Sequence, residues 1–157
     1  MRRFIGWAVL LSGIVLGVAA CASMGEQGSM GAPARTMPSL YQRLGGRNGI
    51  ALVVDDFVAF LVADDRVSTR FTALKPPEVA RLKSNAADQV CAATGGPCAY
   101  LGRDMKTAHR GMNITGAEWD ATVEDLVKAL DKNKVPEKEK NELLGLLGPM
   151  KPDIVGQ

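Results

Sequence analysis

Glycine and proline residues divide the chain from residue 39 to residue 157 into pieces of helical length. The breaks fall at Gly45-Gly46, Pro76-Pro77, Gly95-Gly96-Pro97 and Pro136. Between them, apolar residues recur at intervals of three and four, which is the spacing of one helix face. No stretch alternates apolar and polar residues as a half-buried strand does. The pattern predicts one all-α domain of about 119 residues, enough for a single hydrophobic core.

Local signals predict where the helices begin. Asn48 is a suitable N-cap for a helix that ends near residue 63. Thr115 and Glu118 have the Thr-x-x-Glu spacing of a capping box. Proline at 76 and at 136 is tolerated in a first turn. We expect helices over 40–44, 48–63, 76–93, from 116 on and from 136 on, the fourth with Trp119, Val123, Leu126, Val127 and Leu130 facing inward.

The chain contains one histidine, His109. On a helix, Met105, Ala108 and Met112 share its face. A buried imidazole costs free energy unless it has a partner. One interpretation is a core histidine with a hydrogen-bond partner. The other is an axial ligand to a metal held in a flat apolar cofactor, with the second ring nitrogen bonded to a carbonyl one turn earlier, near Met105.

Residues 1–21 have the features of an export signal. Arg2 and Arg3 precede an apolar run, and Val18-Ala-Ala-Cys21 resembles the lipobox of bacterial lipoproteins. The resemblance implies that Cys21 is lipidated and tethers the mature protein in the bacterial periplasm. Ala22, rather than Asp, after the cysteine suits the outer membrane. An uncleaved anchor or an ordinary secretory signal is the alternative, and residues 22–38, rich in Gly, Ser, Ala and Pro, are expected to form a flexible tether.

The charge of the mature chain is balanced. The full sequence has 19 basic and 17 acidic residues, and Arg2 and Arg3 in the signal account for the excess. A chain without net charge has no electrostatic signature of binding to nucleic acid or to an anionic membrane surface. Nucleic acid is therefore not an expected partner.

Five groups of residues follow one another in a characteristic order and spacing. They are Leu40-Tyr41-Gln-Arg-Leu-Gly-Gly46, Val54-Asp-Asp-Phe57 with Ala63-Asp-Asp-Arg66, Phe71, Arg81-Leu82-Lys83 with Gly95-Gly96-Pro97, and Tyr100-x-Gly-x-x-Met105-x-x-x-His109-x-Gly111-x-x-Ile114-Thr115. Together they resemble the truncated haemoglobins of group I over residues 39 to about 155. The resemblance implies a globin-like, two-over-two helical sandwich that holds haem b, with His109 as the iron ligand.

Haem requires a deep apolar slot and one nitrogen ligand beneath the iron. The residues expected to line this slot would be core residues in any helical fold, so their apolar character alone does not identify a cofactor site. They are Phe57, Phe71, Leu74, Leu82, Ala86, Val90, Leu101, Met105, Ala108, Ile114, Trp119 and Val123. The candidates to pair with the haem propionates, each of which is otherwise a solvated surface charge, are Arg81, Lys83, Lys106 and Arg110.

The side opposite His109 departs from the family pattern. Val58 stands where family members usually carry a tyrosine, and Ala86 where they often carry glutamine. Gln89 lies on one helical stripe with Ala86, so it is a candidate to face the gas ligand; the alternative is a glutamine on an ordinary amphipathic face. Asn85 points about 100° away from Ala86 and is a weaker candidate. Without a strong donor, tight oxygen storage is not expected.

Cys91 and Cys98 flank the Gly-Gly-Pro break, and their spacing fits neither a zinc nor a thioredoxin motif. In an oxidising exported compartment a disulfide is the natural assignment. Two reduced cysteines that pack in the core are the alternative.

Three functions are compatible with the sequence. The first is an exported haem protein that binds oxygen, nitric oxide or carbon monoxide. The second is a haem enzyme that converts nitric oxide to nitrate or reduces peroxide with an external electron donor, since the chain has no flavin or nicotinamide motif. The third is a globin-shaped module without haem.

Overall fold

The computed structural model describes residues 37–157. The expected signal peptide, Cys21 and nearly all of the tether lie outside these residues. The described part is helical, as predicted, and its only strand-like feature is an isolated bridge between Ile114 and Val155. Its helices are α1 (Leu40–Arg43), α2 (Gly46–Ala63), η1 (Ser68–Arg70), α3 (Pro76–Ala93), α4 (Met105–His109), α5 (Gly116–Lys132), α6 (Glu137–Leu147) and η2 (Gly148–Asp153).

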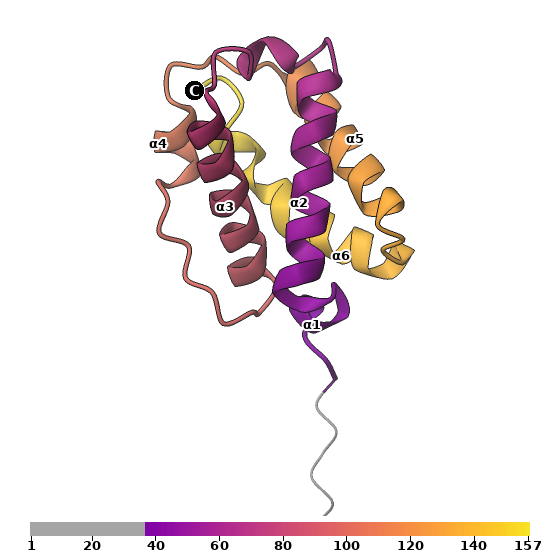
Figure 1. The fold of residues 1–157 in the computed structure, drawn as a ribbon. Helices are drawn as coiled ribbons and strands as arrows, with labels where there is room; N and C mark the ends of the chain where they lie inside the picture. Colours follow the sequence, from indigo (N-terminus) through magenta and orange to yellow (C-terminus); the bar gives the residue numbers. More distant parts are fainter. Residues whose placement is uncertain (1–36) are drawn as a thin grey trace, which may run out of the picture. The chain divides into compact units, whose positions relative to one another are not determined.

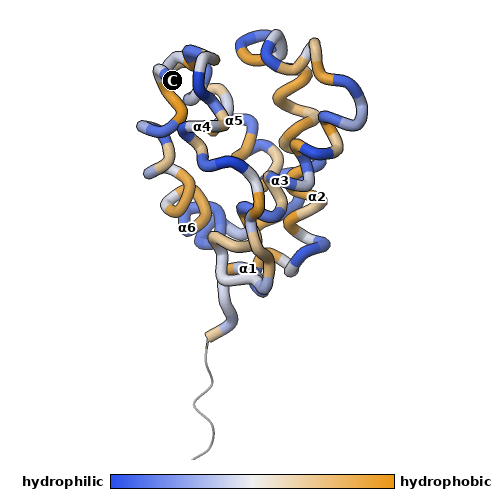
Figure 2. The backbone as a smooth tube through the Cα atoms, turned by 90° about the vertical axis from the view of Figure 1, so that its left-hand side faces the viewer, coloured by the Kyte–Doolittle hydropathy of each residue, from blue (hydrophilic) through white to orange (hydrophobic). Residues whose placement is uncertain are grey.

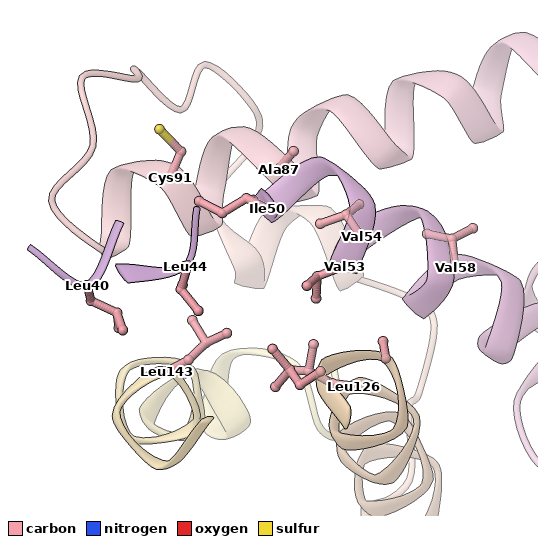
Figure 3. Close-up of a cluster of buried hydrophobic side chains, with 12 residues drawn as sticks. Leu40, Leu44, Ile50, Val53, Val54, Val58, Ala87, Cys91, Leu126 and Leu143 are labelled. Carbon is pink, nitrogen blue, oxygen red and sulfur yellow. The ribbon is translucent and has the colours of Figure 1, made fainter. Parts of the chain in front are cut away.

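Helix α2 lies at the centre of the domain, with α3 on one side and α5 on the other (Figure 1). Helix α1 packs against α2 and α6, and η2 packs against α4 and α6. Figure 3 shows the main core where these helices meet. Apolar residues in the core are Leu40, Leu44, Ile50, Val53, Val54, Val58, Ala87, Cys91, Leu126, Ala129, Leu130 and Leu143.

The starts of α5 and α2 can be compared with the N-caps that the sequence predicted. The predicted capping box of α5 is confirmed, because Thr115 Oγ1 accepts from the Glu118 N–H and Glu118 Oε2 accepts from the Thr115 N–H. The prediction that Asn48 caps the second helix is wrong. The N-cap lies three residues earlier, at Gly45, whose φ of 84° forms a tight left-handed turn that glycine adopts without steric cost.

The inward face of α5 is rotated slightly from the predicted one. Leu126 and Leu130 are buried as expected, but Val127 is only partly buried. Asp125 takes a buried place instead, and its Oδ1 accepts a hydrogen bond from Lys128 Nζ at 2.8 Å. A charged residue at a core position cannot be anticipated from apolar spacing.

None of the helices between residues 37 and 157 combines the length and apolar character that crossing a membrane requires.

Candidate functional site

A cavity of about 930 Å³ opens between the helices. Residues from α2, η1, α3, α4, α5, α6 and η2 line it, together with the loop that joins α3 to α4. The residues expected to form the haem slot all line this cavity, as do Val58, Ala86 and Gln89. Ligand pockets in proteins range over about 300–1,000 Å³, so this cavity accommodates a large cofactor. The polar residues in its wall then decide which cofactor fits.

His109 is the last residue of the short helix α4 and is half-buried in the cavity wall. Its Nδ1 lies 2.7 Å from the carbonyl oxygen of Met105, one turn earlier. Because a carbonyl oxygen only accepts, this contact requires the proton on Nδ1 and leaves Nε2 with a free lone pair. The imidazole is thus prepared to bind a metal through Nε2.

Asp104 fixes the start of the helix that carries His109. Its carboxylate accepts a hydrogen bond from the Thr107 N–H at 2.9 Å. This bond lowers the pKa of Asp104, with a smaller contribution from the positive charge of Arg110. The cap holds a helix of only five residues, which its own hydrogen bonds would stabilise poorly.

The turn after His109 is held from one side by Arg70 of η1. Its Nη1 donates to the carbonyl oxygen of Met112 at 2.7 Å, and its Nε donates to Glu118 Oε1 at 2.8 Å. The hydrogen bond from Arg70, with further bonds from Thr115, lowers the pKa of Glu118 to about 2. Arg70 therefore joins three segments, η1, the turn after α4 and the first turn of α5.

The end of the chain holds the same turn from the other side. The Asn113 N–H donates to the Gln157 carbonyl at 2.6 Å, and the Gly156 N–H donates to the Ile114 carbonyl at 2.9 Å. Asn113 has a φ of 48°, a conformation that asparagine tolerates better than most residues. The segment that follows His109 is thus fixed by hydrogen bonds on both sides.

The wall opposite His109 comes from α2 and α3. Val58 is buried and supplies no hydrogen-bond donor. On α3, Leu82, Ala86 and Gln89 line the cavity, and so does Asn85, which the helical-wheel argument had placed on a weaker face. The cavity thus reaches two adjacent stripes of α3. The Gln89 amide nitrogen lies 3.2 Å from Met150 Sδ.

The basic residues that line the cavity are not all those that the sequence predicted. Arg81 lines the cavity as expected, but Lys83 forms an ion pair with Asp55 at 3.0 Å instead. Lys106 and Arg110 are exposed and do not line the cavity. Arg103, which the sequence did not single out, does line it and is exposed like Arg81. Among the described residues neither Arg81 nor Arg103 forms an ion pair.

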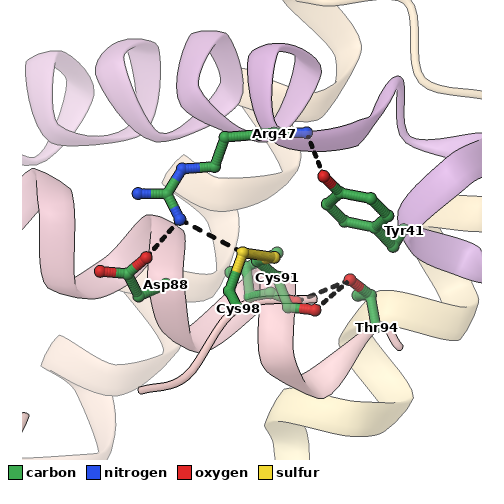
Figure 4. Close-up of a disulfide and its surroundings, with 7 residues drawn as sticks. Tyr41, Arg47, Asp88, Cys91, Thr94 and Cys98 are labelled. Atoms are coloured by element: carbon green, nitrogen blue, oxygen red, sulfur yellow. Dashed lines mark hydrogen bonds and ion pairs between the residues drawn. A yellow bond between two sulfur atoms is a disulfide. The ribbon is translucent and has the colours of Figure 1, made fainter. Parts of the chain in front are cut away.

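A disulfide joins Cys91 at the end of α3 to Cys98 in the following loop, with 5.8 Å between their Cα atoms (Figure 4). Arg47 lies beside it, with Nη1 3.3 Å from Cys98 Sγ, and also pairs with Asp88. The disulfide anchors the start of the loop that leads to α4. Further along, the Tyr100 hydroxyl donates to the Arg103 carbonyl at 2.7 Å.

Comparison with known proteins places this arrangement in a family. The model of the bacterial-like globins matches residues 39–155. The chain belongs to the bacterial-like globin family. The sequence resemblance to truncated haemoglobins is therefore confirmed, and so is the expectation of haem iron as the cofactor.

Relatives of this globin include group 1 truncated haemoglobins. That of Mycolicibacterium paratuberculosis is 34% identical over 116 residues, which cover 74% of this chain and 83% of the relative. That of Synechocystis is 31% identical over 127 residues, which cover 77% of this chain and 100% of the relative. The crystal structure of the Tetrahymena pyriformis truncated haemoglobin in its Fe(III) form has a TM-score of 0.72 at 28% identity, covering 76% of this chain and all of that one.

The residues of this cavity fit haem. The cavity wall is mostly apolar and contains one imidazole whose Nε2 is free. The guanidinium groups of Arg81 and Arg103, which form no ion pair within residues 37–157, complement two carboxylates. Haem presents this combination of a flat apolar ring, one metal that takes a nitrogen ligand and two propionates.

Proposed function

We propose that His109 binds the iron of haem b through Nε2 and that the opposite side of the haem binds a small diatomic gas, such as oxygen, nitric oxide or carbon monoxide. The observation that carries this proposal is the hydrogen bond between His109 Nδ1 and the Met105 carbonyl, which leaves Nε2 as the lone-pair donor in the cavity wall. When bound, haem iron supplies an open coordination position and one-electron redox chemistry.

The chain's own residues set the environment of that gas. Val58, Leu82 and Ala86 exclude water and offer no hydrogen bond. Asn85 and Gln89 are the amide donors on the cavity face of α3. The contact between Gln89 and Met150 is weak, because a thioether sulfur is a poor acceptor, so the amide is free to turn toward a better one.

Arg81 and Arg103 would hold the propionates at the mouth of the cavity. Both lack an ion pair among residues 37–157, so neither has to give up a carboxylate partner. A guanidinium group offers paired donors that match a carboxylate.

We further propose that the protein is exported and attached to the outer membrane through lipid on Cys21. The disulfide between Cys91 and Cys98 supports export, because such bonds persist in oxidising compartments and are rare in the cytosol. The lipobox supports the attachment.

Absorption spectra of the purified protein test the haem proposal directly. The protein as isolated should show a Soret band that shifts on reduction and again on addition of carbon monoxide. A protein that binds no haem under any condition would contradict the proposal.

Catalytic conversion of nitric oxide or peroxide is a second candidate function. It is favoured by the apolar Val58 on the cavity wall opposite His109. Sustained turnover with an added electron donor would distinguish it from reversible binding.

A further inference from the structure

The loop between α3 and α4, residues 94–104, forms part of the cavity wall. Four successive residues of this loop line the cavity: Tyr100, Leu101, Gly102 and Arg103. The loop then leads directly into α4, whose last residue is His109. Figure 1 shows the loop running along one side of the domain, and Figure 2 turns that side toward the viewer. Movement of the loop would therefore change both the cavity wall and the segment that carries His109.

Few hydrogen bonds attach this loop to the rest of the domain. At its start the Gly96 N–H donates to the Cys91 carbonyl at 2.8 Å, and at its end Asp104 caps α4. Among the hydrogen bonds within residues 37–157, none joins the backbone of residues 97–103 to another segment. The bond from the Tyr100 hydroxyl to the Arg103 carbonyl stays inside the loop. The position of this backbone therefore depends on other contacts.

The disulfide supplies the attachment that the hydrogen bonds do not. It joins Cys98 in the loop to Cys91 on α3, and Cys98 lies just before Tyr100, where the loop begins to line the cavity. The contact from Arg47 on α2 ends on the same Cys98 sulfur, at 3.3 Å. The disulfide thus shortens the stretch of unattached backbone from residues 97–103 to residues 99–103. A shorter stretch between fixed ends has less conformational freedom, so the bond restrains the cavity wall.

The two sulfur atoms differ in their access to solvent. Cys91 is 0% exposed, whereas Cys98 is half-buried between the exposed residues Pro97 and Ala99. Thiol–disulfide exchange requires that an attacking thiolate reach a sulfur, so exchange begins at Cys98. The thiolate of a dithiol bonds to Cys98 Sγ, and Cys91 leaves as a thiolate that takes up a proton. The second thiol of the reductant then displaces Cys98, so two electrons pass to the protein and the reductant closes a disulfide.

We propose that the disulfide between Cys91 and Cys98 controls haem retention, because its reduction frees residues 97–103 and loosens the cavity wall. This inference rests on the proposed function, since haem is the group retained. A protein with this control keeps its cofactor in an oxidising compartment, where disulfides persist, and loses it more readily where thiols are kept reduced. A disulfide oxidant restores retention by taking two electrons and two protons from the cysteine pair.

Haem transfer from the full-length ferric protein in detergent to excess apomyoglobin measures retention. Reduction with dithiothreitol should speed the transfer about fivefold or more, which is a fraction of the factor that a disulfide contributes to global stability. Cys91→Ser with Cys98→Ser should show the fast rate without reductant. Dithiothreitol should leave the rate of this double variant unchanged, which excludes a direct effect of the reductant on haem.

The matched control is Leu40→Ala. Leu40 is buried in the main core but does not line the cavity. Its truncation lowers global stability by an amount of the same order as loss of the disulfide. If haem leaves through local movement of the loop, Leu40→Ala should transfer haem within about twofold of the parent rate. Equal acceleration by Leu40→Ala and by the double serine variant would overturn the proposal.

Trypsin cleavage after Arg103 tests the loop independently of haem. Arg103 is exposed and lies in the stretch that reduction frees. Reduction should speed cleavage there, while cleavage after Lys138, an exposed residue of α6, should change much less. A parent protein that binds no haem would count against the proposed function, and the trypsin result would still decide whether the disulfide restrains the loop.

Alkylation with iodoacetamide, read by mass spectrometry, shows whether dithiothreitol has opened the bond in the folded protein. A bond that stays closed would contradict exchange at Cys98. If the double serine variant fails to fold, the oxidised and reduced forms of the parent supply the comparison. Equal haem transfer from these two forms, with the bond shown to be open in one of them, would overturn the proposal.

Discussion

Arg70 donates a hydrogen bond to the carbonyl oxygen of Met112, 42 residues away in the sequence, at 2.7 Å. Through this bond and its pair with Glu118, Arg70 holds the turn directly after His109. Removal of the guanidinium group should therefore loosen the turn that follows His109, the iron ligand that we propose.

Arg70→Met should loosen the bond between His109 and iron. We expect a lower iron–histidine stretching frequency in the resonance Raman spectrum of the ferrous protein and a several-fold faster loss of haem. Arg70→Lys should recover part of both, since one donor returns. An unchanged stretching frequency in Arg70→Met would show that the hydrogen bonds from the chain end, at Asn113 and Ile114, suffice.

The ion pair between Arg70 and Glu118 predicts that the stability of the fold depends on pH. The pKa of Glu118 is lowered from 4.5 to about 2, because Arg70 and Thr115 donate hydrogen bonds to its ionised form. A depressed pKa stabilises the fold fully above about pH 4.5, and this stabilisation is lost as the pH falls toward 2. In Arg70→Met the loss of helical circular dichroism on acidification should begin at higher pH than in the parent, while Lys138→Met should titrate like the parent.

The sequence predicted the helices and most of the cavity wall because both follow from apolar spacing. Residues separated by three or four positions share a face, which is why Leu82, Ala86 and Gln89 were found together. Asn48 was assigned as a cap because its residue type fits, but the positive φ of Gly45 starts the helix earlier.

Other parts of the site depend on contacts between distant segments. The bonds of Arg70 to Met112 and Glu118 join residues more than 40 positions apart, and nothing in the local sequence predicts them. Lys83 and Arg103 illustrate the same limit. Their roles depend on which side of the cavity each side chain faces, and the structure pairs the former with Asp55.

The apolar cavity wall opposite His109 predicts that bound oxygen is released quickly. Val58→Tyr would introduce a hydroxyl donor, and a hydrogen bond to a charged acceptor contributes about 1.5–3 kcal/mol, roughly ten- to a hundredfold in rate if it acts after binding. Stopped-flow measurement should show oxygen dissociation slowed by about that factor, with carbon monoxide affected much less. If Gln89 already donates to the gas, Gln89→Leu should accelerate oxygen loss and Val58→Tyr should do little.

The disulfide should contribute to stability. In the chain-entropy model, closing so short a loop contributes roughly 2–3 kcal/mol. The double variant Cys91→Ser with Cys98→Ser should lower the free energy of unfolding in urea by about that amount. Mass spectrometry of the exported, unreduced protein should find these two peptides linked, and two thiols that react freely with an alkylating agent would contradict the pairing.

Cys21→Ser tests the attachment to the membrane. The substitution should abolish labelling by a radioactive fatty acid and release the protein from the membrane fraction, since the thiol that carries the lipid is gone. A variant that still incorporates the label would show that the lipobox interpretation is wrong.

The measurement closest to the central claim is haem binding by variants of His109. His109→Ala should lose stoichiometric haem, because no other histidine exists in the chain. His109→Gly should recover haem when imidazole is added, since the free base can occupy the vacated position beneath the iron. Full haem content with an unchanged ferrous spectrum in His109→Ala would contradict the assignment of this residue as the iron ligand.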